Sequence, residues 1–366
     1  MEWLAEAHTR AEATRAHQQG RPFSAEAFRS EMERRIARFG CGPNKIAQRG
    51  HVLPDILHTR WDDMQIYRLH EEDAGRSISA RTEAFVAAAE GAMVRLYGER
   101  DAPADLLHVT CTGYASPSPA QRLVAQRGWG DDTRVFHVYH MGCYAAFPAV
   151  RAASGFLHDR RGGRTRGRVD IVHTELCSLH LDPTRHTPEQ LVVQTLFADG
   201  FIAYTACDDA TWSGTTPALR LLAIDESLLP DSADAMTWTC SAHGMQMSLA
   251  RDVPQRIGTS VWRFVERLAG RVGLAPRELR RAVFAVHPGG PRILDHVAGA
   301  LDLRADQLAS SHAVLRDHGN MSSATLPHVW AKIAADPDIP DGTVVISLAF
   351  GPGLTICGSV CRKEAG

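Results

Sequence analysis

Two periodicities alternate along the chain. Apolar residues at helical spacing are typical of amphipathic helices, whereas short runs rich in β-branched and aromatic residues are typical of strands. The pattern predicts helices at 3–19, 24–39, 81–97, 119–126, 145–153, 261–272, 277–281 and 291–301. It predicts strands at 106–111, 135–139, 169–176, 219–224, 283–287, 344–349 and 354–361. Strands that alternate with helices indicate an α/β fold.

A polar segment near the middle of the chain predicts its division. Residues 208–217 are rich in Thr, Ser, Gly and Asp, which favours a linker. We therefore expect two halves, 1–216 and 217–366, each of which alternates strands and helices. A turn that feeds a strand is predicted over 195–204, and a helix after Asn320 is expected to continue through Val329. The last strands are expected to pair around a glycine turn.

One predicted strand leads to a cysteine. The strand 135–139 leads to a tight corner at Gly142, followed by Cys143. An alanine-rich apolar helix comes next, with Pro148 expected in its first turn. At such a strand-to-helix corner, free backbone amides and the helix dipole favour a thiolate over a thiol. Cys143 is therefore a candidate nucleophile. The alternative is an inert buried cysteine.

Two later turns carry complementary chemistry. His287 ends the strand 283–287, ahead of Pro-Gly-Gly, and Asn320 follows a glycine just ahead of a helix. Taken alone, each is an ordinary turn residue. Taken with Cys143, they form a set in which an imidazole can activate a thiol, and in which imidazole and amide together can polarise a thioester carbonyl.

The composition is that of an ordinary soluble enzyme. The 366 residues include 40 basic and 42 acidic ones, and the net charge of −2 provides no field for nucleic acid or an anionic membrane. The 18 histidines and 8 cysteines lack CxxC, HxH or HExxH spacing, so no metal site is predicted. Dispersed thiols, without a signal peptide or apolar span, favour a reduced, cytoplasmic protein. The arginine-rich segment 160–168 is more typical of a solvated loop than of a phosphate site.

These motifs resemble the type III polyketide synthases, the chalcone synthase family of the thiolase fold. The likeness rests on MGCYAAFPAVRAA around Cys143, HPGGPRILD at His287, GNMSSAT at Asn320, LFADG at 196–200 and FGPGLT at 350–355. The resemblance implies a homodimer of five-layered αβαβα subunits, each built from two similar halves. It also implies a ketosynthase that carries an acyl chain on cysteine and extends it by decarboxylative Claisen condensation. Such an enzyme needs no bound cofactor and uses phosphopantetheine thioesters as substrates.

The resemblance implies roles for individual residues as well. Cys143 would be the nucleophile and acyl carrier, and His287 and Asn320 would stabilise the enolate or oxyanion. His287 would also activate the cysteine. Phe197 matches one of the family's two gatekeeping phenylalanines between thioester tunnel and cavity. The remaining expected pocket residues are Phe350, Ser322 and Glu175.

Other positions depart from the family pattern. Met247 stands at the second gatekeeper position, and Trp238 replaces a glycine, so the cavity is expected to be smaller or divided. In the turn that collects basic residues for coenzyme A phosphates, only Lys45 and Arg49 remain as candidates for binding the thioester arm. This loss of positive charge favours an acyl carrier protein over coenzyme A as the delivering thiol.

Two activities within this class are predicted. One is the fusion of two β-ketoacyl chains, presented on carrier proteins, into an α-pyrone of the kind found in antibiotic biosynthesis. The other is iterative extension of a starter with malonyl-coenzyme A to a pyrone or resorcinol. A Cys-His-Asn hydrolase and a catalytically silent scaffold are weaker alternatives. The HPGG and FGPG turns disfavour the hydrolase, and the intact Cys143, His287 and Asn320 disfavour the scaffold.

Overall fold

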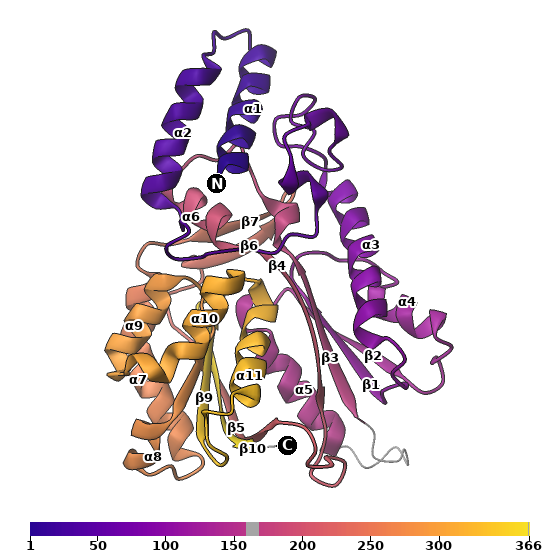
Figure 1. Ribbon diagram of the computed structural model, residues 1–366, viewed down its shortest axis with the longest axis vertical. Helices are drawn as coiled ribbons and strands as arrows, with labels where there is room; N and C mark the ends of the chain where they lie inside the picture. Colours follow the sequence, from indigo (N-terminus) through magenta and orange to yellow (C-terminus); the bar gives the residue numbers. More distant parts are fainter. Residues whose placement is uncertain (159–167, 365) are drawn as a thin grey trace.

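Two four-stranded sheets organise the molecule (Figure 1). The computed structural model describes residues 1–158, 168–364 and 366. In the first sheet, with the order β2-β1-β3-β4, the first three strands are parallel and β4 is antiparallel. In the second sheet, β10 lies between β5 and β9, and β8 forms the edge beside β9. The strands are β1 (Asp105–Thr110), β2 (Arg134–Tyr139), β3 (Val169–Leu176), β4 (Asp199–Ala206), β5 (Ala218–Leu228), β8 (Val283–Val286), β9 (Val344–Gly351) and β10 (Thr355–Glu364).

Helices cover both sheets and fill the space between them. The helices α5 (Ala146–His158) and α11 (Thr325–Ala335) contact strands of both sheets and form the central layer. The first sheet is covered on its other face by α3 (Ile78–Tyr97) and α4 (Pro119–Gln126), and the second by α7 (Val253–Gly270) with α9 (Pro291–Leu301) against it. This is the predicted five-layered αβαβα arrangement of the thiolase fold.

The central layer has the composition that its position requires. Helix α5 buries Ala146, Phe147, Ala149 and Ala153, and these small residues let a helix approach two sheets at once. The predicted division between the halves falls in the connection from β4 to β5. Because the chain passes there from the first sheet to the second, the predicted linker joins two structural layers.

Several smaller elements stand at one end of the molecule. The helices α1 (Glu2–Gln18) and α2 (Ala25–Phe39) pack on each other, and α2 contacts α6 (Pro188–Leu196). A hairpin of β6 (Met236–Cys240) and β7 (Met245–Leu249) lies beside α6 (Figure 1). The remaining helices are α8 (Pro276–Arg281) and α10 (Ala309–His318). None of the helices in the described ranges is both long enough and apolar enough to cross a membrane.

Most predicted elements are confirmed, but some predictions are wrong. Helix α7 begins at Val253 rather than at residue 261, because Ile257 is buried one turn before Val261 although Gly and Ser occupy the intervening turn. The stretch 195–204 opens with the last residues of α6, not with a turn. The residue pattern did not predict α6, α10 or the β6–β7 hairpin. The arginine-rich segment 160–168 lies outside the described residues except for Arg168, which binds Asp170.

Candidate active site

Cys143 lies at the predicted strand-to-helix corner. A single turn of 3-10 helix, Gly142–Tyr144, connects β2 to α5. Gly142 has φ +78°, and a Cβ there would lie 2.7 Å from Cδ of Pro352, so the corner requires glycine for both conformation and space. In the opposing turn, Gly351 is also required for space, since a Cβ there would lie 2.2 Å from the Tyr144 ring. The FGPG turn therefore closes over the nucleophile corner.

Asn320 is fixed by its backbone and by one end of its amide. Its N–H donates to the Leu196 carbonyl at 3.0 Å, and its own carbonyl accepts from Ala198 at 2.9 Å. The side-chain Oδ1 accepts from the Ser322 backbone N–H at 2.9 Å. The amide nitrogen is then the group left to act on Cys143, where hydrogen bonding from Asn320 lowers the thiol pKa. The structure thus brings Asn320 to the nucleophile.

His287 follows β8 directly. Its backbone N–H donates to the Leu348 carbonyl at 2.7 Å, and its side chain is 1% exposed. Neither ring nitrogen has a hydrogen-bond partner within the described part of the chain. Burial lowers the pKa of His287 to about 3, so the ring is neutral at pH 7. A buried polar group without a partner costs about 1–3 kcal/mol, which a bound substrate carbonyl can offset.

The predicted resting thiolate is wrong for this structure. Burial, and then the nearby Glu175 carboxylate, raise the pKa of the Cys143 thiol to about 12, although hydrogen bonds from Ser322 and Asn320 act in the opposite direction. The helix dipole is outweighed because the Cys143 side chain is buried and no cation among the described residues acts on it. With His287 neutral, Cys143 rests as a thiol and must lose its proton during the reaction.

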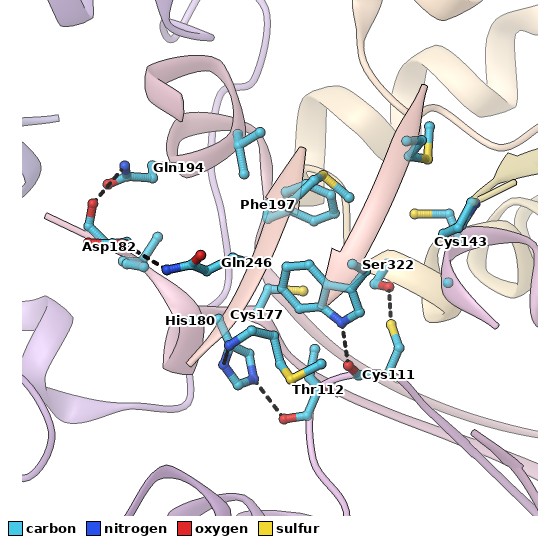
Figure 2. Close-up of a pocket in the computed structure, with 18 of the residues that line it drawn as sticks. Cys111, Thr112, Cys143, Cys177, His180, Asp182, Gln194, Phe197, Gln246 and Ser322 are labelled. Atoms are coloured by element: carbon cyan, nitrogen blue, oxygen red, sulfur yellow. Dashed lines mark hydrogen bonds between the residues drawn. The ribbon is translucent and has the colours of Figure 1, made fainter. Parts of the chain in front are cut away.

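Cys143 opens into a cavity of about 700 Å³, solvent at its mouth included. Figure 2 shows Cys143 and Ser322 on one side of this cavity and Gln194 and Asp182 on the other, with Phe197 between them. The complete lining is Cys111, Thr112, Gly142, Cys143, Cys177, His180, Leu181, Asp182, Gln190, Val193, Gln194, Phe197, Met236, Trp238, Met245, Gln246, Met247, Ser322 and Pro352.

The two predicted departures from the family pattern face each other across the hairpin. Trp238 on β6 pairs with Met247 on β7, and both line the cavity. The Trp238 indole donates to the Cys111 carbonyl at 2.7 Å and packs edge-on against His180, with ring centroids 5.7 Å apart. This hydrogen bond holds the large indole ring in the cavity wall. A ring held there occupies space in the cavity, which agrees with the expectation of a smaller cavity.

The other predicted pocket residues are placed differently. Ser322 lines the cavity, but Glu175 and Phe350 do not. Phe350 is 3% exposed and belongs to the core beneath the second sheet. Glu175 is fully buried behind the wall, where it accepts hydrogen bonds from Thr112 at 2.8 Å and from Ser323. Burial raises the pKa of Glu175, while these hydrogen bonds lower it.

The thioester-arm candidates are not equivalent. Lys45 is exposed. The Arg49 guanidinium is bound to the protein itself, donating to the carbonyls of Thr195 at 2.8 Å and of Cys41 at 2.6 Å. Arg49 therefore ties the turn after α2 to the end of α6, and most of its hydrogen-bonding capacity is used there.

Sequence reasoning missed two thiols and an imidazole in the wall. Cys111, Cys177 and His180 line the same cavity as Cys143. Cys111 and Cys177 each lie at the carboxyl end of a buried parallel strand, which is the signal that could have found them. In the described ranges, no group of three or more His, Cys, Asp or Glu side chains is placed to hold a metal ion.

The geometry argues against a hydrolase of the Cys-His-Asn type. In such a triad the imidazole binds the thiol and the amide orients the imidazole. Among the described residues, both ring nitrogens of His287 lack partners, and Asn320 acts on Cys143 directly. The contacts that define such a triad are therefore not present here.

The five layers and the cysteine corner define an acyl-condensing enzyme of the thiolase fold. The family model "Chalcone and stilbene synthases, C-terminal domain" matches residues 220–364. Type III polyketide synthase C of Arabidopsis thaliana is 30% identical over 263 residues, which cover 70% of this chain and 67% of that protein. The chain belongs to the type III polyketide synthase family.

Other relatives agree with this assignment. Type III polyketide synthase B of the same plant is 26% identical over 354 residues, covering 91% of this chain and 86% of that protein. The C-terminal type III polyketide synthase domain of Steely1, a type I/III hybrid from Dictyostelium, has a TM-score of 0.78 at 24% identity, covering 100% and 96% of the two chains. The 1,3,6,8-tetrahydroxynaphthalene synthase of Streptomyces coelicolor A3(2) has a TM-score of 0.75 at 23% identity, covering 98% and 95%.

Proposed function

We propose that this ketosynthase joins two β-ketoacyl chains, delivered by carrier proteins, into an α-pyrone through an acyl-enzyme on Cys143. The observation that supports condensation most directly is the buried, unpartnered imidazole of His287 together with the Asn320 amide at the Cys143 sulfur. Both groups can donate to an oxygen that gains negative charge, and no described residue binds the two ring nitrogens of His287.

The chemistry follows from these roles. The Cys143 sulfur attacks the donor's thioester carbonyl, the donor carbon–sulfur bond breaks, and the donor leaves as a thiol that has taken the cysteine proton. A second β-ketoacyl thioester loses a proton to solvent from the carbon between its two carbonyl groups and becomes an enolate, whose oxygen accepts hydrogen bonds from neutral His287 and from Asn320. The enolate carbon attacks the acyl carbonyl, a carbon–carbon bond forms, and Cys143 leaves as a thiolate. An enol oxygen of the product then attacks its remaining thioester carbonyl, which closes the pyrone ring and releases the second carrier as a thiol that takes the enol proton.

Delivery by a carrier protein is supported by the chemistry of the turn after α2. Coenzyme A carries several phosphate charges, which basic side chains bind by charge-assisted hydrogen bonds. Of the two candidates, Arg49 is bound to backbone carbonyls, so Lys45 is the cation left exposed in that turn. A phosphopantetheine arm on a carrier brings a single phosphate and needs less positive charge.

Donor competition tests this proposal. The enzyme is offered the same β-ketoacyl chain on an acyl carrier protein and on coenzyme A, and pyrone formation is followed by mass spectrometry. We expect kcat/KM at least about tenfold higher with the carrier, a difference of about 1.4 kcal/mol in transition-state binding. High salt should narrow that gap by screening the carrier contact. Equal or faster turnover with coenzyme A thioesters would contradict carrier delivery.

Iterative extension of a starter with malonyl-coenzyme A is the second candidate. Membership of the type III polyketide synthase family favours it, and the cavity of about 700 Å³ can hold a growing chain. It predicts release of carbon dioxide from malonyl-coenzyme A and a product whose mass grows by ketide units. Carrier-dependent fusion of two finished chains releases no carbon dioxide, so gas release separates the two.

We also propose that the enzyme is a homodimer. Strand β2 forms an edge of the first sheet, and its Phe136 is 45% exposed. The open outer edge of a strand, with an exposed phenylalanine on it, is an aggregation hazard unless another chain covers it. Light scattering during size-exclusion chromatography should give twice the 40.0 kDa chain mass. Phe136→Asp should lower that value, and Trp262→Asp, which alters an exposed tryptophan on α7, should not.

A further inference from the structure

A chain of hydrogen bonds leads away from the nucleophile corner through the wall behind it. The Cys111 sulfur lies 3.0 Å from the Ser322 hydroxyl and 3.5 Å from Oε1 of Glu175. The Ser323 hydroxyl donates to the same Oε1. Ser322 itself hydrogen-bonds Cys143 and lowers its pKa. Cys143 is therefore connected to a fully buried carboxyl group through one hydroxyl and one thiol.

The chain continues past Glu175 toward the far edge of the first sheet. Nδ1 of His173 lies 3.0 Å from the Ser323 hydroxyl, and its Nε2 lies 3.1 Å from the Tyr204 hydroxyl. His173 and Glu175 are two residues apart on β3, so they share one face of the sheet. Tyr204 lies on the neighbouring strand β4 and is partly exposed, whereas His173 is completely buried.

The hydrogen bonds from Tyr204 to Glu175 can all point toward the carboxyl group. The Cys111 thiol also donates to Glu175, and it can turn to its other partner, the Ser322 hydroxyl, when the carboxyl group takes a proton. Ser323 donates to Glu175, so its oxygen is free to accept from His173 Nδ1–H, and His173 Nε2 can then accept from the Tyr204 hydroxyl. Each group can pass its proton to the next and take another from behind. The net result of one passage is that a solvent proton enters at Tyr204 and a proton arrives beside Cys143.

The reaction requires such a delivery. When the enolate carbon takes the acyl group, the carbon–sulfur bond at Cys143 breaks and the electron pair stays on sulfur. This thiolate must gain one proton to regain the resting thiol, whose pKa lies near 12. His287 cannot act as a ready store of protons, because its ring is buried and neutral.

We propose that His173 and Tyr204 form a proton relay that re-protonates Cys143 through Ser323, Glu175, Cys111 and Ser322. This inference rests on the proposed condensation at Cys143. His173 and Tyr204 touch no substrate and act through the residues between, so they are relay residues and not catalytic ones. The groups that face the His173 ring are Glu175 on its own strand, Tyr204 on β4, Ser323 before α11 and, at longer range, His328 on α11. His108 on β1 acts on the ring through the sheet, from the other face. Burial, and then these two imidazoles, lower the pKa of His173 to about 3, so it carries protons by exchanging tautomers while it stays neutral.

The opposite face of the same sheet supplies a matched control. His108 on β1 is also fully buried, and it hydrogen-bonds Thr174 at 2.8 Å and the Tyr139 hydroxyl at 2.7 Å. Thr174 points to the sheet face opposite to that of His173 and Glu175. The His108–Tyr139 pair therefore has the same imidazole and phenol groups as the His173–Tyr204 pair, but no described contact links it to Glu175. Any loss caused only by disturbing a buried histidine should appear in both pairs.

The test compares His173→Gln and Tyr204→Phe with His108→Gln and Tyr139→Phe in the full-length enzyme. Multiple-turnover condensation is measured in H₂O and D₂O, with β-ketoacyl thioesters on the carrier that the wild type uses. We expect kcat to fall about tenfold in the His173 and Tyr204 variants at unchanged KM, a smaller factor than direct acid–base catalysis gives because the relay acts at a distance. The solvent isotope effect should increase in those variants alone, and imidazole should restore turnover to His173→Ala.

The alternatives are distinguishable. A kcat of His173→Gln and Tyr204→Phe within twofold of that of their controls would overturn the relay. Equal losses of kcat in both pairs of variants, with equal losses of stability, would also overturn it. If His173→Gln fails to fold, Tyr204→Phe still tests the relay, because it removes only one hydroxyl from a partly exposed side chain. An increased solvent isotope effect on its kcat supports the relay, and an unchanged one overturns it. No turnover in the wild type would instead overturn the proposed condensation.

Discussion

Asn320 offers the sharpest separation of catalysis from stability. Its two side-chain ends have different tasks: Oδ1 accepts from the Ser322 backbone N–H at 2.9 Å and from the Thr325 hydroxyl at 3.3 Å, while the amide nitrogen acts on Cys143. Asn320→Ala removes both ends. Asn320→Asp keeps the acceptor and removes only the donor, at the cost of a negative charge beside the thiol.

The magnitudes follow from these contacts. Loss of one donor to a developing oxyanion costs about 10²–10³ in rate, or about 2.7–4 kcal/mol. Loss of the acceptor leaves the buried Ser322 N–H without a partner, which costs about 1–3 kcal/mol of stability. Asn320→Ala should therefore show both losses. Asn320→Asp should keep near-wild-type stability and lose condensation. Its charge should raise the pKa of Cys143 further and slow acylation as well.

The assay measures each step separately. Intact-mass spectrometry follows acylation of Cys143, product analysis follows condensation, and chemical denaturation gives the free energy of unfolding. We expect Asn320→Ala to accept an acyl group while condensation falls at least about a hundredfold. Condensation by Asn320→Ala within threefold of the wild type would remove Asn320 from the reaction. A similar loss of stability in both variants would refute the division of labour between its two ends.

Three further predictions follow from the corner and the cavity. Because the pKa of the Cys143 thiol is raised to about 12, the rate at which iodoacetamide labels it should rise about tenfold per pH unit up to about pH 9. The Cys143→Ala variant measures the labelling of the other cysteines, which is subtracted. A labelling rate that levels off below pH 8 would show that Cys143 rests as a thiolate. Gly351→Ala should lower the free energy of unfolding by about 1–3 kcal/mol, because the added methyl group would clash with Tyr144. Gly270→Ala is the control, since its methyl group would meet no atom within 4 Å. Equal stability of the two variants in chemical denaturation would contradict this packing. Trp238→Ala should allow the enzyme to accept longer acyl chains, measured by competition among donors of increasing chain length. Trp262→Ala, which removes an exposed side chain, should leave the preferred chain length unchanged. The same preferred length in both variants would show that the Trp238 indole does not limit the cavity.

The sequence was a good guide where local chemistry decides the structure. Gly142 and the apolar run after Cys143 predicted the corner, and the turns at His287 and Asn320 were placed correctly, because glycine and strand ends are local signals. The β6–β7 hairpin was missed because its residues are mostly half-buried and show no clear alternation of apolar and polar positions. The first turns of α7 were missed because Gly258 and Ser260 are poor helix formers that tertiary packing overrides.

The chemistry of the site was harder to predict because it depends on distant segments. The protonation of Cys143 is set by its burial, and then by Glu175 on β3 and by Ser322 and Asn320 from the turn between α10 and α11. A sequence motif gives the nucleophile and its helix, but burial and neighbouring charge depend on the assembled corner. For the same reason Arg49 was predicted as a ligand for the thioester arm, although its guanidinium is held by backbone carbonyls.

The central claim is that Cys143 carries the growing or transferred acyl chain. The most direct measurement is peptide mapping by mass spectrometry after brief exposure of the enzyme to one acyl donor without a second substrate. The account predicts that the acyl mass lies on the peptide that contains Cys143, and that Cys143→Ala loses it. An acyl mass on Cys111 or Cys177, which line the same cavity, with Cys143 unmodified, would contradict it.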